Sequence, residues 1–147
     1  MALIERIQQD LKVAMRAGDV PTRETLRMVL ADLKNRRIEL GRDLSQDDEL
    51  GVLTRGVKSR VESAEQFDAG GRPELAEKER GEIAVIERYL PEQLSEEDVR
   101  GLVQAVVAEL GLTEKKQLGQ VMKTMMARHK GQVDGKLVQK LAGELLA

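Results

Sequence analysis

The residues of this sequence best suited to chemistry are the lysines of its last third, which could neutralise phosphate groups. Positions 113 to 147 hold seven basic and three acidic residues, whereas the first 112 residues are acidic overall. Lys116, Lys123 and Lys130 recur every seven residues, a spacing that would place them along one stripe of a helix. Lysine ammonium groups bind phosphates as point charges. This segment therefore predicts contact with a polyanion such as the backbone of a nucleic acid.

Glycines near these lysines would leave the backbone open to a partner. Gly119 lies beside the expected stripe, and Gly131 follows it in a loop. Backbone N–H groups at the start of the last helix could attract an anion, although Asp134 is placed to cap them. The alternative interpretation is an ordinary solvated face of a helical bundle. The residues expected to bind nucleic acid are Lys116, Gly119, Lys123, Lys130, Gly131, Lys136 and Lys140.

A second set of charged residues surrounds a predicted helix hairpin. On a helical wheel Glu79 and Glu82 fall on the inward side, where an unpaired carboxylate would be costly. An ion-pair network that fixes the hairpin is therefore expected. Paired carboxylates could also serve acid–base catalysis in a cleft, but no nucleophile, phosphate loop or metal cage accompanies them. The expected network consists of Lys58, Arg60, Arg72, Glu79 and Glu82.

The composition excludes several kinds of functional site. The chain has no cysteine, so thiolate metal sites, cysteine nucleophiles and disulfides are excluded. One Phe, one Tyr and no Trp are too few for a platform on which bases stack. A single histidine, His129, is expected to cap carbonyl groups or pack at the rim of the core, since one histidine cannot make a multi-histidine metal site. The sequence thus predicts no catalytic residue, no metal site and no cofactor.

The elements that position these residues are predicted to be helices throughout. Ile4, Ile7, Leu11 and Met15 are three or four residues apart, as on the inner face of a helix, and similar stripes follow along the chain. Val61 belongs to one such inner stripe. The expected N-caps of the later helices are Thr22, Ser45, Ser95, Thr113 and Asp134.

Pro91 interrupts the helical pattern, and residues 89–94 are expected to form a linker. The predicted fold is all-α, with a four-helix N-terminal module (1–91) and a three-helix C-terminal module (92–147). No apolar run is long enough to cross a bilayer, and the N-terminus lacks a signal-peptide block. We therefore expect a cytoplasmic protein without a membrane partner, and an organellar location is the alternative.

Several short motifs, in this order and spacing, resemble the YqeY family of small helical proteins. Each motif is weak alone, but together they extend over about 120 residues. They are Leu26-Arg27, residues 58–63 (KSRVES), residues 71–76 (GRPELA), Glu79, Glu82, Tyr89-Leu90-Pro91, residues 119–123 (GQVMK), residues 130–138 (KGQVDGKLV) and Leu145-Leu146.

The C-terminal motifs are also similar to the tail domain of GatB, the B subunit of tRNA-dependent amidotransferases. In that family the helical tail contacts tRNA, and similar domains occur in some glutaminyl-tRNA synthetases. The resemblance implies that Gly119, Lys123, Lys130, Gly131 and Lys136 face RNA. One departure is Gly135, where GatB tails commonly have proline. The catalytic body of GatB has no counterpart in this chain.

Three functional hypotheses follow from the residues and the resemblance. The leading one is a non-catalytic tRNA-binding protein of translation that recognises RNA shape through phosphates and 2′-hydroxyls. The second is an adaptor for an amidotransferase or an aminoacyl-tRNA synthetase. The third is an amide-forming carbon–nitrogen ligase with glutamine as nitrogen donor, an activity that the resemblance suggests but no residue of this chain supports.

Overall fold

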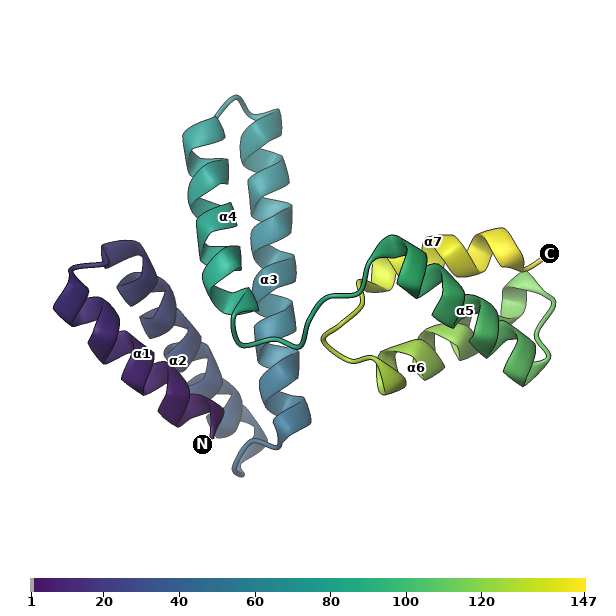
Figure 1. Ribbon diagram of the computed structural model, residues 1–147, viewed down its shortest axis with the longest axis horizontal. Helices are drawn as coiled ribbons and strands as arrows, with labels where there is room; N and C mark the ends of the chain where they lie inside the picture. Colours follow the sequence, from purple (N-terminus) through teal and green to yellow (C-terminus); the bar gives the residue numbers. More distant parts are fainter. Residues whose placement is uncertain (1) are drawn as a thin grey trace. The chain divides into compact units, whose positions relative to one another are not determined.

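The computed structural model describes residues 2–147, and every regular element in that range is helical, which confirms the all-α prediction. Figure 1 shows the helices in chain order. They are α1 (Leu3–Ala17), α2 (Val20–Leu40), α3 (Gln46–Ala69), α4 (Pro73–Glu87), α5 (Glu96–Leu110), the short 3₁₀ helix η1 (Lys115–Gln117), α6 (Leu118–Arg128) and α7 (Gly135–Leu145).

The chain divides into two compact units, one ending at Leu90 and the other spanning Pro91–Ala147. We call them unit 1 and unit 2. Unit 1 holds α1 to α4 and unit 2 holds α5 to α7. Each unit buries its own cluster of aliphatic side chains. The chain therefore has two separate hydrophobic cores.

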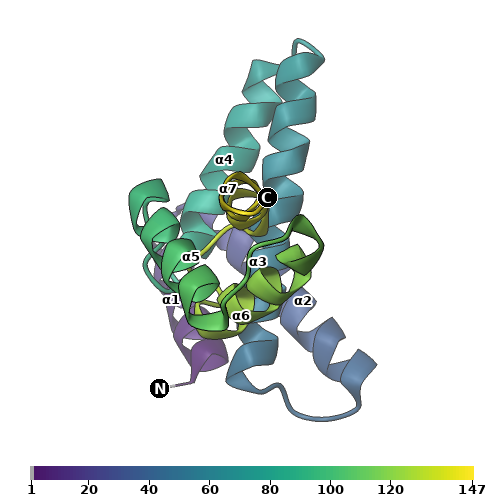
Figure 2. The same cartoon turned by 90° about the vertical axis from the view of Figure 1, so that its right-hand side faces the viewer.

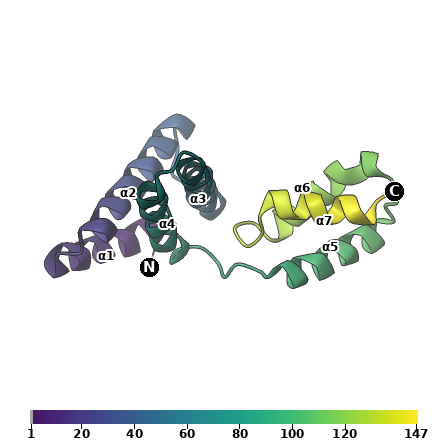
Figure 3. The ribbon, with the colours of Figure 1, turned by 90° about the horizontal axis from the view of Figure 1, so that it is seen from above.

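Unit 1 consists of two helical hairpins. α1 packs against α2, and α3 packs along α4 to form a hairpin whose turn contains Gly70 and Gly71 (Figure 1). Figure 3 shows α3 and α4 nearly end-on and side by side. α2 contacts both α3 and α4, and thereby joins the hairpins. Leu26, Leu33 and Ile86 are among the fully buried residues of this core.

Two inner-face assignments in unit 1 were wrong. Met15 was expected inside, but it is 51% exposed, and Ala14 is the buried residue of that turn. Val61 was also placed inside and is 40% exposed. Apolar spacing alone therefore overestimates burial at these two positions.

The start of α2 differs from the prediction. Thr22 was expected to be the N-cap, but Asp19 holds that position, and its carboxylate accepts the N–H of Thr22 at 3.2 Å. α2 therefore begins at Val20, with Pro21 in its first turn. Proline is well suited to that position because its missing N–H would have no helical acceptor.

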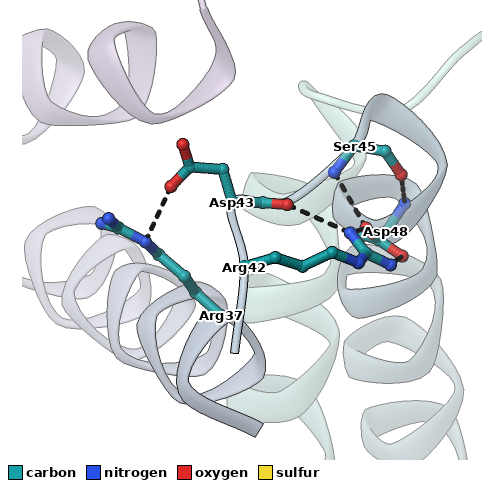
Figure 4. A network of polar contacts seen from close by, with 5 residues as sticks. All are labelled: Arg37, Arg42, Asp43, Ser45 and Asp48. Atoms are coloured by element: carbon teal, nitrogen blue, oxygen red, sulfur yellow. Dashed lines mark hydrogen bonds and ion pairs between the residues drawn. The ribbon is translucent and has the colours of Figure 1, made fainter. Parts of the chain in front are cut away.

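Ser45 caps the N-terminus of α3, as predicted, and the cap is a capping box that the sequence analysis did not foresee. The Ser45 hydroxyl accepts the N–H of Asp48 at 3.1 Å, and the Asp48 carboxylate accepts the N–H of Ser45 at 2.8 Å (Figure 4). The Arg42 guanidinium donates to the same carboxylate at 2.6 Å. These hydrogen bonds, that of Arg42 first, hold the pKa of Asp48 well below its ordinary value.

Replacing Asp48 with asparagine should destabilise unit 1 at neutral pH and much less in acid. The folded pKa of Asp48 is lowered, so its stabilising contribution is fully present above the unfolded pKa of about 4 and is lost as the pH falls toward the folded value. Urea unfolding at several pH values, followed by the fluorescence of Tyr89, measures this difference. Asp47→Asn, at the neighbouring exposed position, is the control. If Asp48→Asn lowered the free energy of unfolding by the same amount at every pH, the stabilising role of the ionised Asp48 would be contradicted.

Tyr89 joins the two ends of unit 1 and is not part of the linker that was predicted for residues 89–94. Its hydroxyl donates to Asp10 on α1, and the Arg6 guanidinium lies 5.4 Å from the centre of its ring. Burial, followed by the bond to Asp10, raises the pKa of Tyr89 above its ordinary value. Leu90 packs against the same core. The connection between the units is therefore shorter than residues 89–94.

Unit 2 is a three-helix arrangement in which each helix contacts the other two. Figure 2 shows α7 almost end-on, with α5 and α6 beside it. α5 begins at Ser95, whose hydroxyl accepts the N–H of Asp98 at 3.1 Å, so this predicted cap is confirmed. Val103, Val121 and Leu141, one from each helix, are fully buried. Met125 of α6 is also fully buried.

Candidate nucleic-acid interface

The predicted lysine stripe does not lie on one helix. Lys123 is in α6, but Lys116 is in the 3₁₀ helix before it and Lys130 is in the turn after it. The seven-residue spacing therefore does not produce the straight row that a continuous helix would give. The three lysines are all exposed, on three consecutive segments.

The residues before α6 make contacts that prevent a longer helix. Thr113 was expected to cap this helix, but its carbonyl oxygen accepts the N–H of Ala147 at 2.8 Å. The N–H of Lys115 in turn donates to Ala147 at 2.9 Å. The side-chain oxygen of Gln117 accepts the N–H groups of Thr113 and Glu114. The segment thus pairs with the last residue of the chain, and α6 begins only at Leu118.

Lys136 and Lys140 lie on the outward face of α7. They are four residues apart and both are exposed, whereas Val138 and Leu141 of the same helix are fully buried. α7 packs against α6 through its opposite face. Exposed lysines therefore extend over η1, α6, the following turn and α7.

Most lysines of unit 2 have no acidic partner, in contrast to its arginines. Arg100 pairs with Glu144 at 3.1 Å, and Arg128 makes two bonds to Glu109 at 2.7 and 2.9 Å. The bond to Arg128 lowers the pKa of Glu109. Lys116 pairs with Glu114 at 2.9 Å. Among residues 2–147, no carboxylate lies within 4.0 Å of the ammonium groups of Lys115, Lys123, Lys130, Lys136 and Lys140.

Gly131 is buried, and this differs from the expectation that it faces RNA. Its φ of 80° lies in the left-handed region, where a side chain would be strained. The Gln93 side chain donates to its carbonyl oxygen, and the carbonyl of Gln132 accepts the N–H of Leu94 at 3.0 Å. Gly131 therefore shapes a turn that is joined to the start of unit 2.

Gly119 and the N-terminus of α7 were also expected to contact an anion, and they differ in whether their backbone is free to do so. Gly119 is exposed, and a methyl group added there would meet no atom within 4 Å. The backbone of α6 is thus accessible at this position. At α7 the carboxylate of Asp134 accepts the N–H of Lys136 at 3.0 Å, which confirms the predicted cap. This amide is therefore already occupied and does not offer a donor to an external anion.

His129 ends α6. Its N–H donates to the carbonyl of Met125 at 2.9 Å, and its side chain is half-buried. This position agrees with the expected role at the rim of the core. Within residues 2–147 there is no cluster of three or more His, Asp or Glu side chains that could hold a metal ion.

The second predicted set of residues comes together only in part. Arg60 of α3 donates through Nε to Glu82 of α4 at 3.0 Å, and both side chains are about 14% exposed or less. Arg72 instead pairs with Glu74 at 2.7 Å on the exposed surface. Lys58 and Glu79 take part in no ion pair among residues 2–147. Lys58 is exposed and Glu79 half-buried, so the network reduces to one pair across the hairpin.

Comparison with known proteins decides the family. The YqeY family, described as Yqey-like protein, matches residues 4–146. The chain belongs to the YqeY family. The match takes in both units of the fold and all the motifs from which the resemblance was drawn.

Relatives of this YqeY-family chain include fungal proteins named "Altered inheritance of mitochondria protein 41, mitochondrial". The protein from Pyrenophora tritici-repentis is 31% identical over 149 residues, which cover 98% of this chain and 81% of the relative. That from Kluyveromyces lactis is 34% identical, covering 98% and 74%. That from Clavispora lusitaniae is 38% identical over 90 residues, covering 60% and 52%.

The names of these relatives assign them to mitochondria, so a cytoplasmic location for this YqeY-family chain stays a prediction. No helix between residues 2 and 147 has the length and apolarity needed to cross a membrane.

Sequence reasoning missed the residues that hold the turn after α6. Gln93 and Gln132 act through bonds between segments about 40 residues apart, and the side chain of Gln132 donates to the carbonyl of Glu92 at 3.3 Å. Neither glutamine belongs to a periodic pattern or a cap. The one available signal was that Gln132 lies within residues 130–138, a motif of the YqeY resemblance, whereas Gln93 lies in none of these motifs.

Proposed function

We propose that this YqeY-family protein binds tRNA through unit 2 and has no catalytic activity of its own. The observation that carries this proposal is a set of five exposed lysines in unit 2 that have no acidic partner among residues 2–147: Lys115, Lys123, Lys130, Lys136 and Lys140. An ammonium group already bound to a carboxylate would have to give up that partner before binding phosphate. Unpaired lysines do not carry this cost, so they favour a polyanionic ligand.

Structured RNA is the polyanion that the surface suits best. Unit 2 contains no Phe, Tyr or Trp, and in unit 1 the one tyrosine is buried and the one phenylalanine half-buried, so stacking on unpaired bases is disfavoured. Lysines spread over several segments suit the phosphates and 2′-hydroxyls of a folded RNA. The similarity of the C-terminal motifs to the GatB tail supports tRNA as that RNA. In this proposal unit 1 is a rigid body or a docking surface for an amidotransferase or an aminoacyl-tRNA synthetase.

The proposal predicts tight and salt-sensitive binding of tRNA. If five lysines each neutralise one phosphate, the logarithm of the association constant should fall with the logarithm of salt concentration at a slope of roughly −4. Titration of fluorescently labelled bulk tRNA with the full chain at increasing salt measures this slope. Absence of binding even at low salt would contradict the proposal and favour the adaptor hypothesis, which predicts a stable protein complex and no affinity for free RNA.

A further inference from the structure

Unit 1 contains a groove that the proposal for unit 2 does not use. It lies between α2 and α3 and has a volume of about 300 Å³, the lower end of the range for small-ligand sites. α3 packs more extensively on α4 than on α2, which leaves space on the α2 side. Three arginines line the groove: Arg36 from α2, and Arg55 and Arg60 from α3.

The three guanidinium groups differ in what already binds them. Arg60 is held by Glu82 and by the carbonyl of Gly56 at 3.1 Å, so it forms a fixed part of the groove wall. Arg36 uses Nη1 for Glu39 at 3.2 Å, which leaves its other nitrogens available. Among residues 2–147, no carboxylate lies within 4.0 Å of Arg55, which is exposed. Arg36 and Arg55 can therefore offer donors to an anion from opposite walls.

Gly56 allows the close position of Arg60. A methyl group on Gly56 would lie 3.3 Å from Nη1 of Arg60, a tight contact for the side chain that reaches Glu82. The absence of a side chain also keeps this part of the groove open. The shape of the groove therefore depends on Gly56 and on the paired side chain of Arg60, and not only on flexible arginines at the surface.

An acceptor lies one helical turn from Arg36. Asp32 also lines the groove, is exposed, and has no cation within 4.0 Å among residues 2–147. Four residues of α-helix, about 6 Å of rise, separate it from Arg36. A carboxylate at such a distance from a phosphate site can accept hydrogen bonds from ribose hydroxyls, as acidic residues do in dinucleotide sites. Asn35 and Ser59 add neutral donors and acceptors to the same groove.

We propose that the groove between α2 and α3 binds a ribonucleotide, with its phosphate between Arg36 and Arg55 and its ribose hydroxyls donating to Asp32. The site lies wholly within unit 1 and does not rest on the function proposed for unit 2. The nucleotide is either a free nucleotide or a nucleotide of an RNA, and both present the same phosphate and ribose.

Calorimetric titration of the full chain with adenosine monophosphate, and separately with adenosine, tests the site. The monophosphate should bind, and adenosine should bind at least about tenfold more weakly because it lacks the charged group. Arg55→Gln should weaken binding of the monophosphate roughly tenfold. Lys34→Gln removes an exposed positive charge elsewhere on α2 and should leave binding unchanged.

The Asp32→Asn variant distinguishes a specific nucleotide site from nonspecific electrostatic attraction of the phosphate. It removes a negative charge from the groove, so nonspecific electrostatics predicts tighter binding of the monophosphate. A hydrogen-bonding role for Asp32 predicts weaker binding. No binding of the monophosphate at millimolar concentration, equal losses for Arg55→Gln and Lys34→Gln, or tighter binding by Asp32→Asn would each overturn the proposal.

A tRNA titration with the same variants identifies the source of the nucleotide. Weaker tRNA binding by Arg55→Gln supports a nucleotide of the RNA, and unchanged tRNA binding supports a free nucleotide. The variant with Lys123→Glu and Lys130→Glu should keep its affinity for adenosine monophosphate. Failure of the tRNA proposal for unit 2 would therefore leave the nucleotide result intact.

Discussion

Replacing both Lys123 and Lys130 with glutamate should weaken tRNA binding by about 100-fold or more. Neither ammonium group has an acidic partner among residues 2–147, so in the proposed complex each is free to neutralise a phosphate. Glutamate removes that attraction and adds repulsion. The salt slope should also become shallower by about two, because two fewer phosphates are neutralised.

The double variant should remain folded. Lys123 is exposed on α6 and Lys130 is exposed in the turn that follows, and neither side chain belongs to the core. Exposed substitutions of this kind usually change stability by about 0.5 kcal/mol or less. Circular dichroism should therefore show the same helix content as the unchanged chain.

A charge-matched control shows whether the loss of tRNA affinity comes from these two positions in unit 2 or from the change in net charge. Lys12→Glu combined with Lys78→Glu changes the net charge by the same amount at exposed positions of unit 1. This control should keep most of the affinity for tRNA. Equal losses in the two double variants, or full affinity in the Lys123 and Lys130 variant, would remove the assignment of the interface to unit 2.

Local chemistry made much of the fold predictable. Ser45, Ser95 and Asp134 each cap the helix that the sequence assigns to them, because a short side-chain oxygen before an apolar stripe has few other uses. Thr113 has the same character and is not a cap. Its backbone pairs with Ala147, and a contact between residues so far apart leaves no periodic signal in the sequence.

The candidate interface was predictable in its residue types but not in its geometry. The excess of lysine after position 113 is visible in the sequence, whereas the lack of acidic partners depends on which helix each carboxylate lies on. Gly131 was assigned to the RNA-facing surface because the motif that contains it resembles the GatB tail. Only the structure shows that it serves a buried turn with φ of 80°. The groove between α2 and α3 likewise depends on how two hairpins pack.

Glu82→Ala should destabilise unit 1 by about 2 kcal/mol. Arg60 and Glu82 are 13% and 14% exposed, so their pair lies between the exposed class, worth about 0–1 kcal/mol, and the buried class, where loss of one partner costs about 3–5 kcal/mol. Removing the carboxylate leaves the Arg60 guanidinium with the Gly56 carbonyl as its remaining oxygen acceptor. Urea unfolding followed by Tyr89 fluorescence reports on unit 1, since the chain has one tyrosine and no tryptophan.

Two further variants distinguish the cost of leaving the Arg60 charge buried without its partner from the stabilisation that the Arg60–Glu82 ion pair provides. Arg60→Met together with Glu82→Leu removes both charges and should restore stability to within about 1 kcal/mol, because apolar groups of similar size can replace a buried pair. Glu74→Ala breaks the exposed pair with Arg72 and should leave stability unchanged. A double variant no more stable than Glu82→Ala would show instead that the pair itself holds α3 against α4. In that case the charged residues of the YqeY-like motifs on the hairpin would be required for the fold of unit 1.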